Sequence, residues 1–204
     1  YAKGPFSAYV YYNKRVFEDN GIETPYELYT QNKWTIDKMH EIANQLTVER
    51  DGTLESIGLY CSDETPFVAA TGRDIIAKDE NGKLINNIRD PLISRAFQRI
   101  QKMSVEDKSL IMDSTIARDM MLNGNIAMWA GGSWESDNFR ILLQRGDIEF
   151  VPFPRDTQVD EWYLSGSVYT EYIPEGAKNP DAAIAWVAAN IELGNNKDFR
   201  DKSA

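Results

Sequence analysis

The sequence has a single cysteine, Cys61, and a single histidine, His40, among its 204 residues. One cysteine excludes an internal disulfide, and the two residues together are too few for a Cys/His zinc site. His40 stands beside Met39 in a stretch with helical spacing of apolar residues, where a histidine usually has a structural or solvent-facing role. We therefore expect no metal centre and no catalytic triad, since a triad needs a positioned histidine base.

Positive charge is also scarce, because 22 Lys and Arg stand against 32 Asp and Glu and give a formal net charge of −10. No basic cluster is longer than a pair, which argues against a nucleic-acid or anionic-membrane partner. No apolar run reaches the roughly twenty residues that a membrane-spanning helix needs. The chain begins in mid-pattern at Tyr1, with no Met, signal peptide or lipidation motif, and this predicts a piece of a longer protein.

The common motifs of catalytic and cofactor sites are missing as well. The chain has no G-x-S-x-G elbow and no G-x-x-x-x-G-K phosphate loop. An acidic, aromatic-rich chain keeps a carbohydrate hydrolase open as an alternative, although adjacent carboxylates in loops are more often solvated surface. The adjacent pairs are Asp63-Glu64, Asp79-Glu80 and Asp160-Glu161. We expect no catalytic residue, no metal and no cofactor.

What the sequence does contain is a mixture of short apolar runs and longer amphipathic stretches, which predicts strands and helices with helix predominant. Expected strands cover residues 10–12, 57–60, 126–130, 149–154 and 167–173, and a hairpin covers 75–85. Helices are expected after Asn13, Thr35, Asp90, Ser114 or Thr115 and Asn179, and from Trp134 to about Gln144. The last helix is expected to turn Ala183, Trp186, Val187 and Ile191 inward, and Trp34 and Phe97 are expected in the core.

The aromatic residues, 5 Trp, 10 Tyr and 8 Phe, exceed what a minimal core needs. Aromatic rings also line sites for flat apolar faces such as those of sugars. One of them, Trp134, follows Gly131-Gly132-Ser133 at the end of an apolar strand and at the start of an expected helix. Glycines there let a ligand approach the backbone, and free N–H groups at the helix start can donate to ligand hydroxyls. The sequence thus indicates a binding site rather than a catalytic one, with Trp134 either stacking on a ligand or closing the core.

Four segments, in order and spanning nearly the whole chain, resemble the extracellular solute-binding proteins that feed sugars to ABC importers, the family that includes maltodextrin-binding proteins. The first is Val10-Tyr11-Tyr12-Asn13-Lys14 with Phe17 and Gly21-Ile22, and the second is Trp34-Thr35-Ile36-Asp37 with Ala43, Leu46-Thr47 and Gly58-Leu59. The third runs from Met121 to Met128 and adds Gly132 and Trp134. The fourth is Phe153-Pro154, Gly166, Ile173-Pro174, Lys178-Asn179-Pro180 and Ala182-Ala183.

The resemblance implies an α/β fold: a periplasmic-binding-protein-like type II lobe, rich in helix, with a small mixed sheet. It implies an incoming hinge segment at 1–8, the second ligand-binding lobe at 9–160, and a hinge strand and helix at 161–204 that return towards a missing first lobe. It also implies extracellular or cell-surface capture of a carbohydrate or other small solute, without chemistry, for an ABC permease. The parent protein would be periplasmic or a membrane-anchored lipoprotein.

Carried over position by position, the resemblance makes Trp134 the ring that stacks on the sugar, with Ser133 and Gly132 beside it. The loop from Asp63 to Phe67 resembles a second contact region, in which Asp63 or Glu64 accepts hydroxyl hydrogen bonds and Phe67 adds a ring face. Further expected contacts are Gly166 and Ser167, where the chain recrosses at the cleft, and Trp162 with Tyr163 at its rim. The remaining alternative, besides a hydrolase, is a module whose aromatics serve a protein partner.

Overall fold

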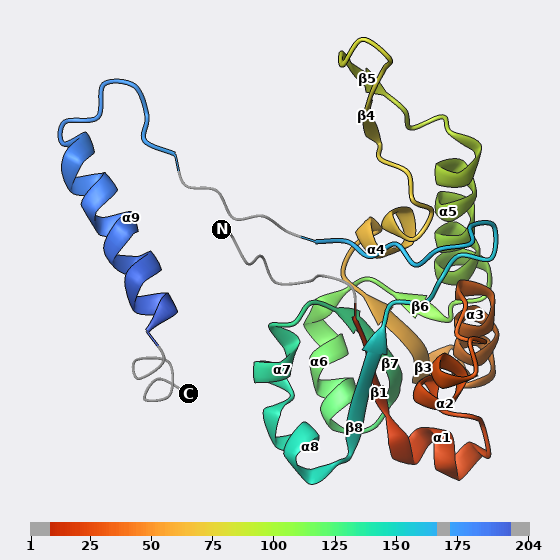
Figure 1. Cartoon of the computed structure of the whole chain (residues 1–204). Coiled ribbons are helices and arrows are strands. Elements are labelled where there is room, and N and C mark those ends of the chain that lie inside the picture. Colours follow the sequence, from red (N-terminus) through yellow and green to blue (C-terminus); the bar gives the residue numbers. More distant parts are fainter. Residues whose placement is uncertain (1–8, 167–171, 197–204) are drawn as a thin grey trace. The chain divides into compact units, whose positions relative to one another are not determined.

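The computed structural model describes residues 9–166 and 172–196. These two ranges fall in two separate compact units, divided between residues 168 and 169 (Figure 1). The first unit holds a sheet with helices on both faces, and the second holds one long helix.

The sheet of the first unit is mixed, with strand order β2-β3-β7-β1-β8 and with β6 pairing to β3. Its strands are β1 Tyr9–Asn13, β2 Val48–Arg50, β3 Thr53–Cys61, β6 Leu110–Ile111, β7 Ile126–Gly131 and β8 Ile148–Pro152. β3 runs parallel to β7, whereas β1 runs antiparallel to its neighbours β7 and β8. The carboxyl ends of β3, β7 and β8 therefore meet the amino end of β1 at one end of the sheet. We call this end the strand-end rim; there Tyr9 pairs with both Gly131 and Pro152.

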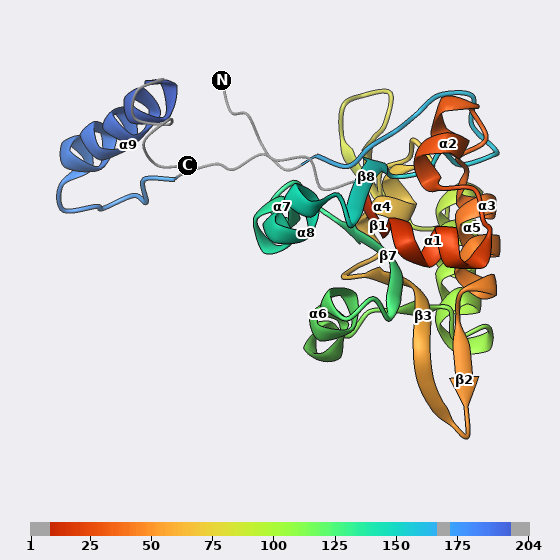
Figure 2. The same cartoon turned by 90° about the horizontal axis from the view of Figure 1, so that it is seen from below.

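Two groups of helices cover the two faces of this sheet (Figure 2). On one face lie α1 Lys14–Asn20, α2 Pro25–Thr30, α3 Ile36–Gln45, α4 Thr65–Ala69 and α5 Pro91–Gln101, which continues as a π-helical turn, Lys102–Glu106. On the other lie α6 Ser114–Leu122, α7 Glu135–Asn138 and α8 Arg140–Arg145. Successive residues of a strand face opposite sides, with irregularities in β3 and β7, so the sheet divides the interior into two hydrophobic clusters. Val10 and Tyr12 of β1 belong to the first cluster and Tyr11 to the second.

Most of the predicted helix starts are confirmed, because they depend on local capping. The side chains of Asn13, Thr35 and Asp90 each accept a hydrogen bond from a backbone N–H of the first helical turn. The predicted hairpin is confirmed as β4 Ile76–Lys78 and β5 Leu84–Asn86. The helix expected at Ser114 or Thr115 begins at Ser114, and its cap is Asp113.

Other expected boundaries were wrong. The single helix expected from Trp134 to about Gln144 is two short helices, and β3 extends well beyond residues 57–60. The strand expected at 149–154 ends at Pro152. Residues 167–171 of the strand expected at 167–173 lie outside the described residues, and Tyr172 and Ile173 are not in a strand.

The second unit contains α9 Pro180–Asn195, which Asn179 caps as predicted. Within its own unit Trp186 is 63% and Ile191 is 60% exposed, and the expected inward orientation of this helix stays a prediction. Within the described part of its unit, α9 has no second helix or strand to pack against. Trp34, by contrast, is buried as expected, and Phe97 is partly buried against the core. Among the described helices, none combines the length and the apolar character required to cross a bilayer.

Candidate functional site

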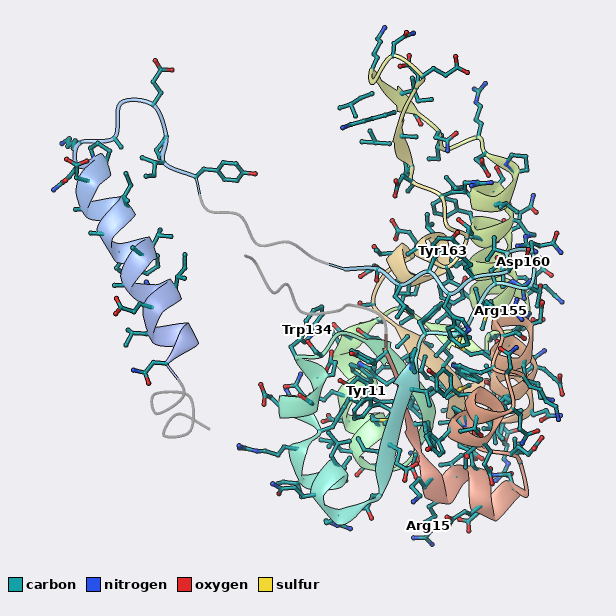
Figure 3. The ribbon with its side chains drawn as sticks, in the orientation of Figure 1. Tyr11, Arg15, Trp134, Arg155, Asp160 and Tyr163 are labelled. Atoms are coloured by element: carbon teal, nitrogen blue, oxygen red, sulfur yellow. The ribbon has the colours of Figure 1, made fainter. Side chains whose placement is uncertain are left out.

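Two predicted site segments lie together at the strand-end rim. Because β3 and β7 are parallel, the loop Ser62–Glu64 that follows β3 and the loop Gly132–Trp134 that follows β7 leave the sheet at the same end. Figure 3 shows Trp134 and Tyr163 at this end of the first unit, and Arg15 at the other. The ends of parallel strands are the usual place for a ligand in an open α/β sheet.

Trp134 is held at the rim by a glycine that makes room for its ring. A Cβ atom at Gly132 would lie 2.2 Å from the six-membered ring of Trp134, so the indole occupies the space that a side chain would fill. The Gly132 carbonyl oxygen in turn accepts a hydrogen bond from the Tyr11 hydroxyl at 3.0 Å. Trp134 remains 45% exposed, so one part of its ring is packed and another part faces solvent.

The backbone after Gly132 differs from the expectation of several free donors at a helix start. The N–H groups of Glu135, Ser136 and Asp137 donate to the carbonyls of Gly132, Ser133 and Trp134 at 3.1–3.2 Å. Within the described chain, the N–H groups of Ser133 and Trp134 in this turn form no hydrogen bond. Most N–H groups of the turn are therefore used in its own backbone hydrogen bonds, and those of Ser133 and Trp134 remain as donors beside the exposed indole.

The loop after β3 presents two exposed carboxylates, Asp63 and Glu64. Asp63 closes the loop: its Oδ1 accepts from the Thr65 N–H at 2.8 Å, and its carbonyl oxygen accepts from the Cys61 thiol at 3.1 Å. Burial raises the pKa of the Cys61 thiol to about 12, so this side chain is an unreactive packing group at neutral pH. Glu64 makes no such loop contact and lines a cavity.

That cavity, of about 580 Å³, connects the loop after β3 with the segment that leads out of the first unit. It is lined by Glu64, Thr65 and α4 on one side, by Gly72, Arg73, Asp74 and Ile75 on a second, and by Tyr163, Leu164, Ser165 and Gly166 on a third. Gly72 has φ +66°, and a Cβ there would lie 2.7 Å from the Tyr163 ring. The cavity thus joins two predicted site residues, Glu64 and Gly166, with Tyr163, which the sequence suggested as a rim contact.

Phe67 and Trp162 lie where their rings are already in contact with other rings. Phe67 is 1% exposed and packs edge-on against Phe153, with ring centroids 5.1 Å apart. Trp162 is partly buried and packs edge-on against Tyr29 at 5.4 Å. This burial favours a supporting role for both rings; their predicted contact with ligand stays a prediction. Ser167 lies outside the described residues.

Sequence reasoning did not single out Glu135, Arg73 or Gly72, and it left the orientation of Trp129 open. Trp129 is 5% exposed and stacks on Tyr60 with ring centroids 3.9 Å apart. Glu135 had one available signal, its place immediately after Trp134, but nothing in the sequence shows where its carboxylate lies.

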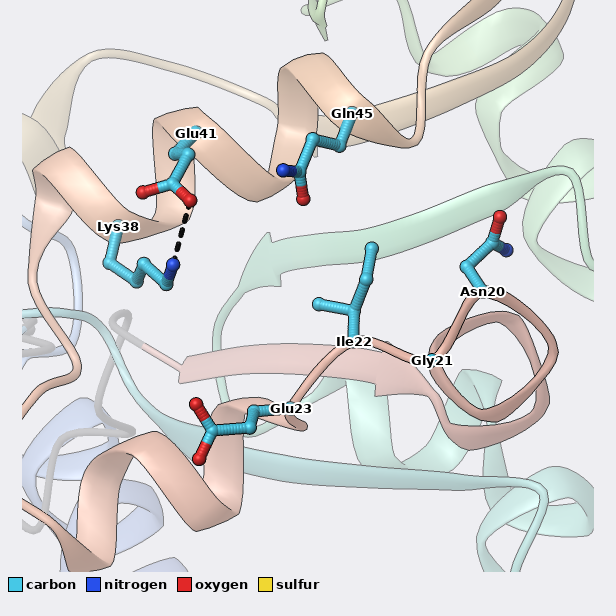
Figure 4. Close-up of a pocket in the computed structure, with 7 residues that line it drawn as sticks. All are labelled: Asn20, Gly21, Ile22, Glu23, Lys38, Glu41 and Gln45. Atoms are coloured by element: carbon cyan, nitrogen blue, oxygen red, sulfur yellow. Dashed lines mark hydrogen bonds and ion pairs between the residues drawn. The ribbon is translucent and has the colours of Figure 1, made fainter.

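Other polar features lie away from the rim residues. A cavity of about 550 Å³ between the end of α1 and α3 is lined by Glu23, Lys38, Glu41 and neighbouring residues, and Lys38 pairs with Glu41 at 2.7 Å (Figure 4). It contains none of the predicted site residues. His40 forms a 2.6 Å contact with Asp107, in keeping with the structural role inferred for it. Within the described ranges, no group of three or more His, Cys, Asp or Glu residues is arranged to hold a metal ion.

The sequence matches no protein-family model and no curated protein, but solved structures resemble the fold. The GacH receptor of Streptomyces glaucescens, solved unliganded and with acarbose, matches with a TM-score of 0.62 and 23% identity, over 91% of this chain and 46% of its own. An ABC substrate-binding protein from Listeria monocytogenes in complex with cycloalternan matches with a TM-score of 0.63 and 18% identity, over 95% of this chain and 50% of its own. The extracellular solute-binding protein from Staphylococcus aureus in complex with maltose matches with a TM-score of 0.65 and 15% identity, over 99% of this chain and 51% of its own.

These likenesses confirm the predicted fold class. The chain has the α/β fold of the periplasmic-binding-protein-like solute-binding proteins, and it spans about half the length of the solved proteins that it matches. Identities of 15–23% show the fold and leave the ligand of this chain open.

Proposed function

We propose that this chain forms one lobe of a solute-binding protein of an ABC importer and that its strand-end rim is half of a carbohydrate site. One observation carries the proposal: a half-exposed tryptophan, two exposed carboxylates and a cavity lined by one of these carboxylates lie at the ends of the parallel strands. The sugar and oligosaccharide ligands of the solved proteins with this fold support the ligand class.

Recognition at the rim uses stacking and charge-assisted hydrogen bonds. The exposed part of the Trp134 indole offers an apolar face to the C–H side of a sugar ring, worth on the order of 1 kcal/mol per ring contact. Asp63 and Glu64 are acceptors for sugar hydroxyls, and hydrogen bonds to ionised groups are the stronger kind. None of these groups needs to react with the ligand.

The second half of the site would come from another lobe. A ligand drives closure of two lobes only as far as it binds the closed state better, so it must touch both. The segments 1–8 and 161–204 are proposed to connect to that lobe, and the lobe of this chain is proposed to extend over 9–160. The closed, loaded protein is then proposed to dock on a membrane permease from the extracellular or periplasmic side, held there by a lipid anchor or free in the periplasm.

Calorimetric titration tests this proposal against a panel of maltose, maltotriose, cycloalternan, acarbose and a polyol. The 204-residue chain and any longer protein that contains it are titrated in parallel, because a single lobe binds more weakly than two. Trp134→Ala is expected to weaken binding by about tenfold, the loss of roughly 1–1.5 kcal/mol of stacking.

The matched control is Leu122→Ala, since Leu122 is 46% exposed, like Trp134, but ends α6 and lines a cavity with Asn13 and Asp147, at the end of the sheet opposite the rim. It is expected to bind as the unchanged chain does. Recovery of the intact sugar separates capture from hydrolysis, and sugar cleavage that disappears in Asp63→Asn or Glu64→Gln would establish the hydrolase instead. Absence of binding to every member of the panel would refute the carbohydrate assignment.

A further inference from the structure

At Gly131, the last residue of β7, two neighbouring side chains fill the space above the backbone that a side chain would take. A Cβ atom at Gly131 would lie 2.8 Å from Cγ of Glu135 and 3.0 Å from Nε1 of Trp129. Two side chains from different elements, one carrying an acceptor group and one a donor, therefore converge on the same point above the backbone. We call this point the Gly131 notch.

The donor in the notch has no partner. Trp129 is almost completely buried, stacked on Tyr60 and edge-on to Phe139, and its Nε1–H forms no hydrogen bond within the described structure. A buried N–H without an acceptor loses its water without replacement, so native proteins rarely leave one. Trp34 shows the ordinary solution, since its Nε1–H donates to the Pro152 carbonyl at 2.9 Å.

The Glu135 carboxylate also has an oxygen without a hydrogen-bond partner. Oε2 of Glu135 accepts a hydrogen bond from the Asn138 side chain at 2.8 Å, whereas Oε1 has no partner and the carboxylate forms no ion pair with any described residue. The charge stands near two tyrosines: after burial, Glu135 is the next largest cause that raises the pKa of both Tyr11 and Tyr60. The Glu135 side chain thus approaches a buried free donor through its Cγ, and its carboxylate, with one free oxygen, belongs to the residue that follows the exposed Trp134.

A hydroxyl group is complementary to this pair, because its oxygen accepts one hydrogen bond while its hydrogen donates another. We propose that the Gly131 notch binds one hydroxyl of the ligand, which accepts from Trp129 Nε1 and donates to Glu135 Oε1, so that Glu135 determines which sugar is bound. This inference rests on the proposed function and adds a residue and a specificity to it. Because Nε1 is closed to solvent, the Glu135 side chain rotates away from Gly131 when the hydroxyl enters.

The discriminating experiment is a cycle of protein variants and deoxy sugars, measured by calorimetry. Maltose and its monodeoxy analogues are titrated into the unchanged chain, Glu135→Ala, Trp129→Phe and the control Asp137→Ala. Asp137 is an exposed acid on the same short helix and lies outside the notch. Thermal unfolding of each variant, followed by circular dichroism, establishes that the fold is retained, and the Trp129 indole N–H is followed by NMR during each titration.

For the unchanged chain and for Asp137→Ala, removal of one particular hydroxyl is expected to weaken binding by about tenfold to a hundredfold, the range for hydrogen bonds to charged groups. For Glu135→Ala and Trp129→Phe the same removal is expected to have little effect, and the indole N–H resonance of Trp129 shifts only with sugars that carry that hydroxyl. If Glu135→Ala shows the same deoxy-sugar pattern as the unchanged chain, the inference is wrong and a trapped water fills the notch. Loss of binding in Trp134→Ala would still uphold the proposed function in that case, whereas absence of maltose binding to the unchanged chain would overturn both.

Discussion

Two glycines of this chain are crowded to the same degree, yet their replacement by alanine should have opposite consequences. A Cβ at Gly132 would lie 2.2 Å from the Trp134 ring, and a Cβ at Gly58 would lie 2.0 Å from the carbonyl oxygen of Ala43. The difference is in what must move. At Gly132 the obstacle is a half-exposed side chain that can rotate into solvent, whereas at Gly58 it is the backbone of α3, packed on β3.

Gly132→Ala is therefore expected to change stability by less than about 1 kcal/mol, since the indole turns outward at little cost. Sugar binding should fall by about tenfold, as in Trp134→Ala, because the displaced ring no longer stacks. Gly58→Ala must separate α3 from the sheet, and overpacking of this kind costs about 1–3 kcal/mol or more. For a chain of this size that corresponds to a fall in Tm of about 3–10 °C.

The assay combines thermal unfolding with calorimetric titration, and Gly166→Ala is the control for unfolding alone, because Gly166 lines the candidate site. A Cβ at Gly166 meets no atom within 4 Å and its φ is not positive, so that variant should unfold like the unchanged chain. A large fall in Tm for Gly132→Ala would mean that Trp134 is part of the core and not a free stacking surface. An unchanged Tm for Gly58→Ala would refute the packing of α3 on β3 described above.

Three further predictions concern stability and reactivity. Hydrogen bonds from Tyr12 and Lys14 lower the pKa of Glu149, so the contribution of Glu149 to folding stability is present above its unfolded-state pKa and is lost as the pH falls through its lower folded-state pKa. In urea unfolding from pH 6 to 3, Glu149→Gln should therefore lose less stability than the unchanged chain. The same dependence of stability on pH in both proteins would contradict this. Cys61 should resist a thiol reagent at pH 8 until the chain unfolds, and rapid labelling under native conditions would show that the site opens. Thr35→Ala should lower the free energy of unfolding by about 1 kcal/mol, because it removes the cap of α3. Urea unfolding measures this, with an alanine substitution at the exposed Thr53 as the control. Equal stabilities of the two variants would argue against the cap.

Local signals account for the part of the fold that the sequence predicted. Asn13, Thr35, Asp90 and Asn179 each cap a helix through a contact two or three residues away, so no knowledge of the tertiary structure was needed. The break between α7 and α8 at Phe139 was missed because it has a tertiary cause: the buried ring packs edge-on against Tyr11 and Trp129. The first half of β3 was missed because Thr53 to Ser56 are not deeply buried and lack an apolar run.

The candidate site also contains residues that the sequence predicted and residues that it did not. The glycines before Trp134 mark a place where backbone and ring come close, and the resemblance supplied the loop after β3, so the sequence predicted both rim segments; their contact with a ligand stays a prediction. The burial of Phe67 could not be predicted, since a ring three residues after Glu64 fits either the wall of a site or the core. Glu135 and Trp129 were missed because their convergence over Gly131 depends on how the chain turns after β7, which no sequence spacing reveals.

A crystal structure of the chain with maltose would show whether the strand-end rim binds sugar. The expected result is a sugar ring stacked against Trp134, with hydroxyls directed towards the carboxylates of the loop after β3. Maltose in the polar cavity between α1 and α3, with the rim empty, would contradict the account.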